Sequence, residues 1–454
     1  MPTSKEADVF ERIAQKYEFE RLGTNWTTEI VAGIALFMSL SYIFIVNPAI
    51  LTQAGIPSGA VFFATVVASG VSTLVMGLWP RLPFALAPGL EANGFFAFVV
   101  VASIGFSWQE GLGLVFWSGV LCLIFTVIPA RQKIIDAIPE GLKSAVSTTV
   151  GVFVTIIGLV VADMLTFESG LPSGVGSFSA PKAMLLYAGF AISVVLSWKR
   201  LRFPAGMLVA IIACTFIARA VGVVPDTPPA DTDQFFAAVL QVQLFSVFAD
   251  PRAWTVLLVF FMIDFYGSIG KFIGLTRATT LQTKGQVRNI GGALYVDGLG
   301  TVGGSLLGTS TIITYVESAV AIGQGGRTGI VAIVCGSLML LSVFFSEIVS
   351  FVPVAAASGV LVYVGWLLLP KYELLDAIRG RGDAGTLDRW DFTIVALMGL
   401  IAAITFSLDK SLLVGFWFYS LRQMITQRGR VNPYLFGSAL VLSVAMAFQY
   451  FGVK

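Results

Sequence analysis

The 454-residue chain contains no histidine, which excludes a histidine-ligated metal site and leaves proton handling to carboxylate side chains. Charged residues are also scarce at 12%, whereas a soluble domain has about 25%. The formal net charge is only +2, and no basic stripe with interleaved aromatic residues occurs. We therefore expect neither a water-soluble protein nor a nucleic-acid partner.

Cysteine is equally sparse. Cys122, Cys214 and Cys335 lie far apart inside apolar runs, which is typical of small buried hydrophobic residues. No metal-ligand cluster and no nucleophile–base pair is evident, so we expect no metal, no cofactor and no enzyme activity. Residues 1–22 are polar and charged, and the first apolar run leads directly into others, so we expect no cleavable signal peptide.

Long apolar runs dominate what is present. Hydrophobic residues make up 56% of the chain, and many runs are about 17–22 residues long, which matches about 30 Å of hydrocarbon at 1.5 Å per residue. The sequence predicts an all-α polytopic membrane protein. The predicted spans lie near 27–46, 58–79, 83–104, 112–129, 143–164, 181–197, 204–222, 254–275, 286–306, 309–323, 327–346, 353–370, 390–407 and 411–426.

Lysine and arginine are concentrated in every second loop between these spans, and such loops usually face the cytoplasm. This pattern predicts a cytoplasmic N-terminus, and we expect the protein in the cell (inner) membrane. The opposite loops are acidic and include Asp226, Asp231, Asp233 and Asp250. The loops placed in the cytoplasm contain Arg81, Arg131, Lys133, Lys199, Arg200, Arg202, Arg277, Lys284, Arg288, Arg327, Lys371, Arg379, Arg381 and Arg389.

An odd number of spans in each half means that the second half enters the membrane from the opposite side. This is the inverted-repeat topology of secondary transporters. We predict a cytoplasmic tail at 1–25, a first repeat of spans 1–7 at 26–222, an extracytoplasmic linker at 223–253 and a second repeat of spans 8–14 at 254–454. A last apolar segment at 433–451 either crosses as a fifteenth span or shares one span with 411–426.

The third span of each half contains a break. Pro88 and Gly89 interrupt the first, and the hydroxyl-rich stretch Thr309-Ser310-Thr311 opens the second. Non-helical backbone at membrane depth is tolerated only where it lines a cavity or is buried in protein. We therefore predict that two extended segments meet near the midplane, with the starts of two short helices at a shared pocket.

Glu91 and Glu317 occupy nearly equivalent positions after these breaks. A carboxylate inside a membrane span is costly and usually marks a function. Each can accept hydrogen bonds from ring N–H or amino groups of a heterocycle, and can bind or release a proton. A purely local capping role is the alternative.

The eighth span adds Asp264 and Lys271, which are two helical turns apart on one face. One interpretation is a pocket-lining pair, with Phe265 or Tyr266 stacking on a planar ligand. The other interpretation is that Asp264 is a structural acceptor and that Lys271 reaches the cytoplasmic edge.

The chain resembles the AzgA-type purine (adenine/guanine/hypoxanthine) permease branch of the nucleobase/ascorbate transporter superfamily. The most specific match is Leu-Gly-Thr-Ser-Thr through Thr-Tyr-Val-Glu-Ser-Ala at 307–319, followed by Gly-Gly-Arg-Thr-Gly. Further matches are Thr-Glu-Ile-Val-Ala-Gly-Ile with Val-Asn-Pro, Pro-Phe-Ala-Leu-Ala-Pro-Gly, and Asn-Gly-Phe-Phe. The resemblance covers roughly 26–452, in the stretches 28–34, 46–48, 83–89, 93–96, 307–319 and 325–329.

The resemblance implies two inverted seven-span repeats, with a core domain of spans 1–4 and 8–11 and a gate domain of the other spans. It also implies proton symport, elevator-type motion, a homodimer and a base held between spans 3, 8 and 10, where Glu317 corresponds to the gripping acid. The chain departs from the family at three places. Gly267-Ser268 replaces Asp-Thr, Lys271 replaces Thr, and Glu91 replaces glycine.

These observations predict a carrier that imports a purine-type nucleobase with protons. The alternatives are a carrier of an anionic or oxidised base (xanthine- or urate-like) or of another small organic anion, and a membrane sensor that binds a base without moving it. The predicted proton-handling residues are Glu91, Asp264, Lys271 and Glu317. The predicted substrate-binding residues are Glu91, Asn93, Asp264, Phe265, Gly267, Ser268, Thr311 and Glu317.

Overall fold

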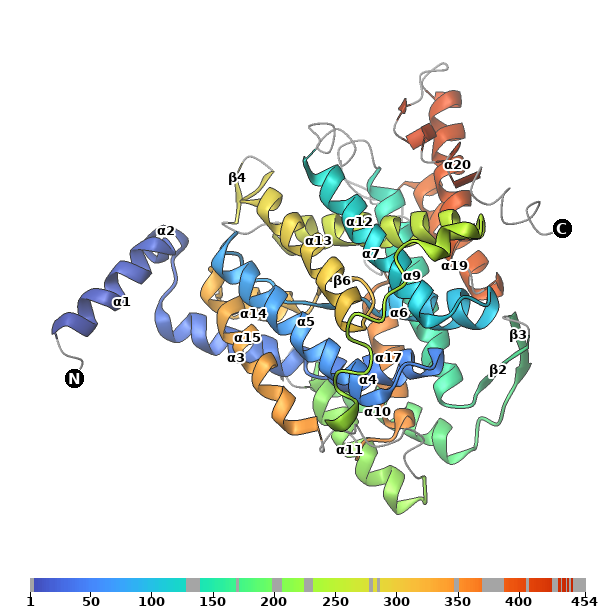
Figure 1. The fold of residues 1–454 in the computed structure, drawn as a ribbon, viewed down its shortest axis with the longest axis horizontal. Helices are drawn as coiled ribbons and strands as arrows, with labels where there is room; N and C mark the ends of the chain where they lie inside the picture. The colour runs from blue at the N-terminus through green and yellow to red at the C-terminus, as the bar shows by residue number, and fades with distance from the viewer. Residues whose placement is uncertain are drawn as a thin grey trace.

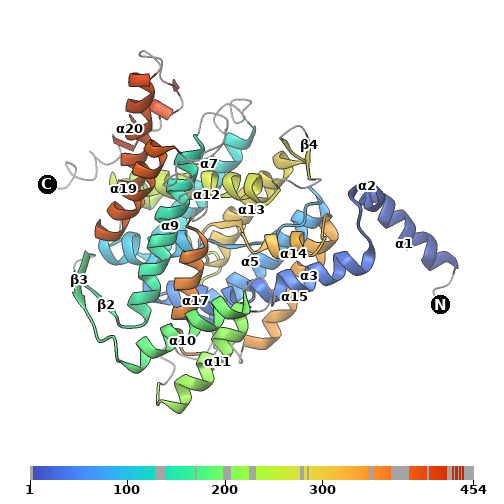
Figure 2. The ribbon, with the colours of Figure 1, turned by 180° about the vertical axis from the view of Figure 1, so that it is seen from behind.

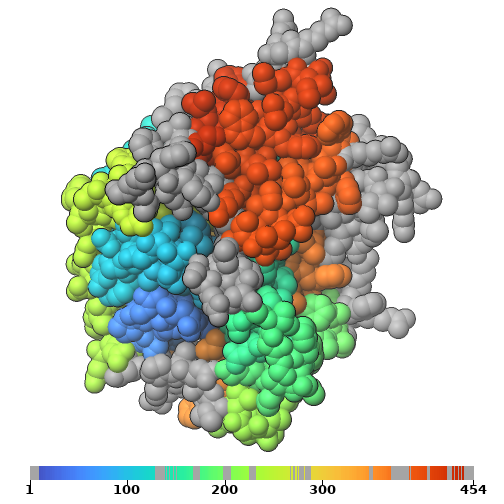
Figure 3. Space-filling view, turned by 90° about the vertical axis from the view of Figure 1, so that its right-hand side faces the viewer, coloured from blue at the N-terminus to red at the C-terminus, as the bar shows by residue number. Residues whose placement is uncertain are grey.

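The computed structural model describes residues 4–127, 139–168, 171–197, 206–223, 232–276, 281–283, 286–346, 351–369, 388–405, 408–426 and most of 432–443. Helices form one packed body, from which α1 (Ser4–Lys16) and α2 (Phe19–Leu22) project at the N-terminal end (Figure 1; Figure 2 gives the view from behind). Segments from the two halves of the chain share one face, where the orange-red C-terminal helices lie above cyan, blue and green segments (Figure 3).

Helices occur at the predicted spans. In the described part of the chain, 4 helices are long and apolar enough to cross a membrane: Trp26–Ala54, Ser58–Leu78, Trp108–Val127 and Ser144–Val161. The main helices of the first half are α3 (Trp26–Leu40), α4 (Ile43–Leu51), α5 (Ser58–Leu78), α6 (Leu90–Gly94), α7 (Trp108–Val127), α9 (Glu140–Val161), α10 (Pro181–Leu196) and α11 (Gly206–Ala220), with the wider π-helix η2 (Phe95–Ser103) continuing α6. Those of the second half are α12 (Arg252–Thr276), α13 (Ile290–Leu307), α14 (Ser318–Gly323), α15 (Gly329–Leu341), α17 (Val354–Leu367), α19 (Arg389–Thr405) and α20 (Leu408–Thr426).

Helices of the first half pack on helices of the second in matching pairs. Helix α5, the second predicted span of the first half, packs on α15, the fourth of the second half; the equivalent helices with the halves exchanged, α13 and α7, also pack on each other. In the same way α10 packs on α17, and the equivalent helices α19 and α9 pack on each other. Two groups result. One contains α3 to α7 with α12 to α15, and the other contains α9 to α11 with α17, α19 and α20.

Glycines bring α5 and α15 into backbone contact. A Cβ on Gly77 would lie 2.4 Å from the carbonyl oxygen of Gly329, and one on Gly329 would lie 2.1 Å from the oxygen of Gly77. One heptad along, a Cβ on Gly336 would lie 2.8 Å from the oxygen of Gly70. Small residues permit such close approach between membrane helices, where dispersion contacts drive packing.

Two short strands cross the interior of the first group. β1 (Leu86–Pro88) pairs antiparallel with β6 (Ile312–Thr314), with Ala87 opposite Ile313. The pairing continues beyond the strands, because Gly89 N donates to Thr311 O at 2.9 Å and Tyr315 N donates to Ala85 O at 3.0 Å. Each strand therefore satisfies the buried backbone of the other, as extended chain in an apolar interior requires. Extended backbone is thus present at both predicted breaks; that the breaks interrupt membrane spans stays a prediction.

Several boundaries differ from the sequence prediction. The helix of the first span is irregular at Ser41–Tyr42, between α3 and α4, although both residues keep helical dihedral angles, and α4 contains Pro48. The prediction of helix from residue 286 was wrong, since β4 (Gln282–Thr283) pairs there with β5 (Gln286–Val287) and α13 begins at Ile290. A hairpin of β2 (Leu165–Glu168) and β3 (Leu171–Val175) and the helical N-terminal segment were not predicted.

Some predicted features lie outside the described residues. They include most of the 433–451 segment, part of the linker with Asp226 and Asp231, and many of the loop cations: Arg131, Lys133, Lys199, Arg200, Arg202, Arg277, Lys284, Lys371, Arg379 and Arg381.

Candidate functional site

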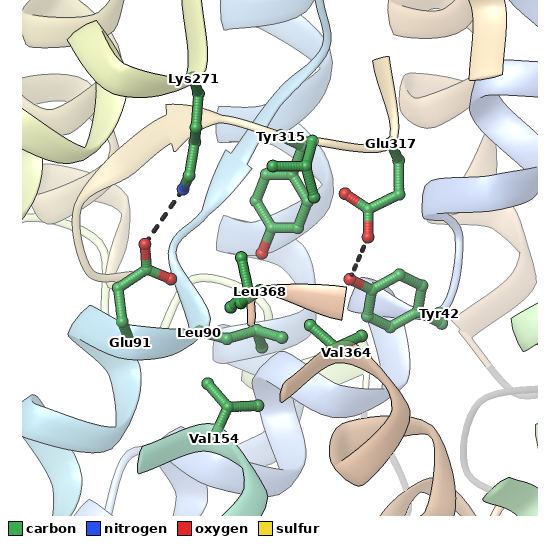
Figure 4. Close-up of a pocket in the computed structure, with 10 residues that line it drawn as sticks. Tyr42, Leu90, Glu91, Val154, Lys271, Tyr315, Glu317, Val364 and Leu368 are labelled. Carbon is green, nitrogen blue, oxygen red and sulfur yellow. Dashed lines mark hydrogen bonds and ion pairs between the residues drawn. The ribbon is translucent and has the colours of Figure 1, made fainter. Parts of the chain in front are cut away.

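A pocket lies where the two helix groups meet. Its empty volume is about 340 Å³, which includes space open to solvent at the mouth. Its polar side chains come from the first group and belong to α4, α6, α12 and the β6–α14 segment (Figure 4). The lining residues are Tyr42, Leu90, Glu91, Val154, Lys271, Tyr315, Val316, Glu317, Val364 and Leu368.

Glu91 and Lys271 form an ion pair on one side of the pocket. Lys271 Nζ lies 3.0 Å from Glu91 Oε1, and the two side chains are 17% and 9% exposed. Glu91 is in the first turn of α6, directly after the β1 strand, and Lys271 is in the last two turns of α12. The ammonium group also lies 5.9 Å from the centre of the Tyr315 ring. Of the predicted pocket-lining pair of the eighth span, Lys271 therefore lines the pocket and contacts Glu91, whereas Asp264 does not line it.

Glu317 lies beyond Tyr315 from this pair (Figure 4). It precedes the first turn of α14, and its Oε1 accepts a 2.8 Å hydrogen bond from the Tyr42 hydroxyl. Its Oε2 is buried and has no hydrogen-bond partner within the described structure. A buried acceptor without a partner is costly, and a ligand N–H group would satisfy it.

Tyr315 fixes the spacing between the two halves of the site. Its ring lies between the Glu91–Lys271 pair and Glu317, and its hydroxyl donates to the carbonyl oxygen of Pro88 (Figure 4). Sequence reasoning missed Tyr315. The sequence signal that could have indicated Tyr315 as a pocket residue is its position directly after the predicted extended segment.

Asn93 and Thr311 do not line the pocket. Asn93 hydrogen-bonds with the side chains of Asn47 and Ser310, and Asn47 in turn donates to Thr309 Oγ1 at 3.1 Å. These contacts join the two extended segments to α4. The Thr311 side chain is buried, and its carbonyl group accepts from Gly89 N. A direct substrate contact for either residue stays a prediction.

Asp264 lies in a second buried polar cluster outside the pocket lining. Its Oδ2 accepts a 2.9 Å hydrogen bond from Thr301, Cys122 and Asp297 are its other close neighbours, and Ser268 lies beside Asp297. Asp264 Oδ1 and Asp297 Oδ1 are both buried without a hydrogen-bond partner among the described residues. Sequence reasoning missed Asp297, although a carboxylate inside an apolar run is itself a signal of function.

Phe265 and Gly267 are also absent from the pocket lining. Phe265 packs against Phe261 and Phe125, with ring centres 5.3 and 6.2 Å away. A Cβ built on Gly267 would meet no atom within 4 Å. The structure therefore brings together Glu91, Lys271 and Glu317 of the predicted site, and places Phe265 in an aromatic cluster. No group of three or more metal-ligating side chains occurs in the described ranges.

The apolar helices of membrane-spanning length in the described residues define an integral membrane protein. The transmembrane domain of a cyanobacterium bicarbonate transporter, BicA, has a similar fold, with a TM-score of 0.62 at 17% identity over 83% of this chain and 97% of that chain. At that identity the likeness concerns the fold alone.

The chain belongs to the Permease family whose model, Xan_ur_permease, matches residues 27–376. Adenine permease AdeP of Escherichia coli is 31% identical over 443 residues, covering 95% of each chain. Guanine/hypoxanthine permease PbuG of Bacillus subtilis is 31% identical over 450 residues, covering 95% of this chain and 99% of its own. These relatives confirm the resemblance drawn from the sequence, and the chain is a transporter rather than an enzyme.

Proposed function

We propose that this protein imports a purine-type nucleobase together with protons. The observation that carries the proposal is a pocket in which Glu91, Lys271 and Glu317 surround a tyrosine ring beside an apolar wall. A planar heterocycle matches this arrangement because its edges offer N–H and carbonyl groups and its faces are apolar. The purines named in the relatives AdeP and PbuG support the same substrate class.

The pocket has a polar side from one helix group and an apolar side from the other, and this division of the lining supports an elevator-like movement. All its charged and hydroxyl side chains belong to the group containing α4, α6, α12 and α14, whereas α9 and α17 contribute Val154 and Val364. An apolar wall forms no hydrogen bonds that sliding would break, so the first group can carry a bound base past it. The matching helix pairs of the two halves support two inverted repeats as the frame for this movement.

We propose proton coupling because buried carboxylates are the side chains available to bind and release a proton during transport. The chain has no histidine, and Glu91, Glu317 and Asp264 are all buried in the helix group that would move. We further propose a location in the inner membrane with a cytoplasmic N-terminus, and a homodimer formed through the second helix group.

An anionic or oxidised base is the second candidate substrate, because Lys271 supplies a cation to the pocket. The described lining has one cation and two carboxylates, however, so the ionised pocket has a net negative charge. That charge opposes an anion and favours a neutral base accompanied by a proton.

Uptake by proteoliposomes tests the proposal. We expect a labelled purine to accumulate when the outside is acidic and to stop accumulating when a protonophore removes the gradient. Excess xanthine, urate or a small organic acid should compete less well than unlabelled purine. The Glu317→Gln variant should lose uptake, whereas Glu110→Gln, at the exposed start of α7, should retain it. Normal, pH-driven uptake by Glu317→Gln, or uptake of an anion but of no purine, would refute the proposal.

A further inference from the structure

Asp264 and Asp297, here called the aspartate pair, bring two carboxyl groups into contact inside the first helix group. Asp264 lies on α12 and Asp297 on α13, and the residues are 0% and 2% exposed. Their side chains are in hydrogen-bonding contact, yet each Oδ1 atom is buried without a donor among the described residues. Two ionised carboxylates contain only acceptors, so a hydrogen bond between them requires a proton.

The surroundings of the aspartate pair do not neutralise two negative charges. Its neighbours Thr301 and Ser268 are neutral, and the titratable group that α7 contributes is the thiol of Cys122. In the described part of the chain, the cation that acts on the pair is Lys271, whose ammonium group lies 3.0 Å from Glu91 Oε1. Two adjacent buried carboxylates repel each other, and a shared proton removes one of the two charges.

The hydroxyl group of Thr301 connects the aspartate pair to the β6 strand. Thr301 Oγ1 accepts a 3.0 Å hydrogen bond from Ile312 N, and it lies 2.9 Å from Asp264 Oδ2 and 3.2 Å from Ile312 O. A hydroxyl group has one hydrogen, which these two acceptors must compete for. An ionised Asp264 attracts that hydrogen, whereas a protonated Asp264 leaves it to the backbone of β6. The β6 strand leads directly to Tyr315 and Glu317 of the pocket.

We propose that Asp264 and Asp297 share the coupling proton of transport, and that the Thr301 hydroxyl transmits its presence to β6. This inference rests on the proposed function and assigns the site of its proton. With the proton bound between the two carboxyl groups, Thr301 donates to Ile312 O. When the proton leaves to water, Thr301 donates to Asp264 and β6 loses that hydrogen bond.

Infrared spectroscopy of the purified protein, with aspartate carrying ¹³C in its side-chain carboxyl group, tests the inference. A protonated carboxyl group has a C=O stretching band distinct from the bands of a carboxylate, and the label shifts that band only if it belongs to aspartate. We expect a label-sensitive band in the unaltered protein at the pH at which it takes up purine. This measurement does not depend on whether a variant folds.

The variants Asp264→Asn and Asp297→Asn should each lose the band, because the asparagine amide donates to the remaining carboxylate in place of the shared proton. In proteoliposomes each should only equilibrate purine, whereas the unaltered protein concentrates it about tenfold under a gradient of about one pH unit. The double variant should be no worse than either single variant, because the two residues act as one unit. The matched control is Asp163→Asn, at an exposed aspartate paired with Lys182, which should keep both the band and the accumulation.

Thr301 is tested by a pair of variants that differ in the hydroxyl group. Thr301→Ser retains the hydroxyl and should keep the accumulation of purine. Thr301→Val has nearly the same shape but cannot donate or accept, so it should only equilibrate purine. Both variants contain the aspartate pair and should keep the infrared band, which separates the transmission of the proton's presence from its binding.

The outcomes separate this inference from the proposed function. If the unaltered protein lacks the band, or if the single aspartate variants keep it, the shared proton is overturned while transport of purine with protons stands. Full accumulation by Thr301→Val would overturn the link to β6, and accumulation driven by a sodium gradient at equal pH would mean that the pair holds a metal ion instead. If the band behaves as expected but a proton gradient never concentrates purine, the proposed function fails although the shared proton stands.

Discussion

The hydroxyl group of Tyr42 donates a 2.8 Å hydrogen bond to Glu317, joining residues that are 275 positions apart in the chain. Tyr42 directly precedes α4, and Glu317 precedes α14. A hydroxyl donor of the first predicted span thus lies against the carboxylate that, by the family resemblance, corresponds to the acid gripping the base.

Tyr42→Phe should weaken base binding without unfolding the protein. Hydrogen bonds to charged groups contribute about 1.5–3 kcal/mol to stability, and this bounds the cost of releasing Glu317 from its position, so we expect the Kd to rise by at most about a hundredfold. Calorimetric titration of the purified protein with its preferred purine measures this. The control is Tyr187→Phe, which removes the exposed hydroxyl that donates to Phe178 O and should leave the Kd unchanged. Equal affinity in both variants would show that the Tyr42 contact does not orient Glu317 for the ligand.

Asp264→Asn should separate binding from proton coupling. Asp264 lies outside the pocket lining, and asparagine can still accept the 2.9 Å hydrogen bond from Thr301, so we expect base affinity within about threefold of the original. With one proton per base and a gradient of about one pH unit, worth about 1.36 kcal/mol, the original protein should concentrate the base about tenfold. The variant should only equilibrate it, because an amide exchanges no proton in this range.

The measurement for Asp264→Asn is the steady-state accumulation ratio in proteoliposomes. The matched control is Asp250→Asn, which alters a carboxylate in the linker that pairs with Arg252. Tenfold accumulation by both variants would remove Asp264 from the coupling mechanism.

Gly77→Ala should destabilise the contact between α5 and α15. Its methyl group would approach the Gly329 carbonyl oxygen to 2.4 Å, and overpacking of this kind costs about 1–3 kcal/mol. We expect a lower melting temperature in detergent. Gly303→Ala is the control, because a Cβ there meets no atom within 4 Å and alanine favours the helix. Equal melting temperatures would mean that the two helices adjust their separation freely.

Glu29→Ala, which removes a buried carboxylate, should destabilise the protein far more than Glu110→Ala, which removes an exposed one. The fully buried Glu29 carboxylate on α3 accepts hydrogen bonds from Arg327 N, Thr328 N and Thr328 Oγ1 at 2.8, 3.1 and 2.6 Å. It therefore caps the start of α15, and each buried donor left unsatisfied costs about 1–3 kcal/mol.

Glu110→Ala provides the comparison for Glu29→Ala, since Glu110, in the first turn of α7, accepts from Ser107 N and Ser107 Oγ at an exposed helix start where water can replace the carboxylate. We expect that variant to cost about 1 kcal/mol or less. Thermal unfolding of both purified variants measures the difference, and similar losses would contradict the importance of burial at Glu29.

The amino-acid sequence by itself determined the membrane character, the positions of the helices, the extended segments around Pro88 and Thr311, and the family. These follow from local chemistry. Apolar runs of membrane length form helices because lipid offers the backbone no other hydrogen-bond partners. Pro88 and Gly89 accompany extended backbone in one such run, although Pro48 and Gly77 lie inside helices. Carboxylates among apolar residues marked Glu91, Asp264 and Glu317 because their burial is costly.

Only the tertiary structure decided which of these side chains share a pocket. Lys271 reaches Glu91 across 180 residues of sequence, whereas Asp264, seven residues from Lys271 on the same helix face, turns to Thr301 and Asp297 instead. Phe265 joins an aromatic cluster, and Tyr315 enters the pocket although no periodicity marked it. The physical reason is that a helical repeat fixes which residues share a face, but the packing of α5 on α15 and the pairing of β1 with β6 fix what each face meets.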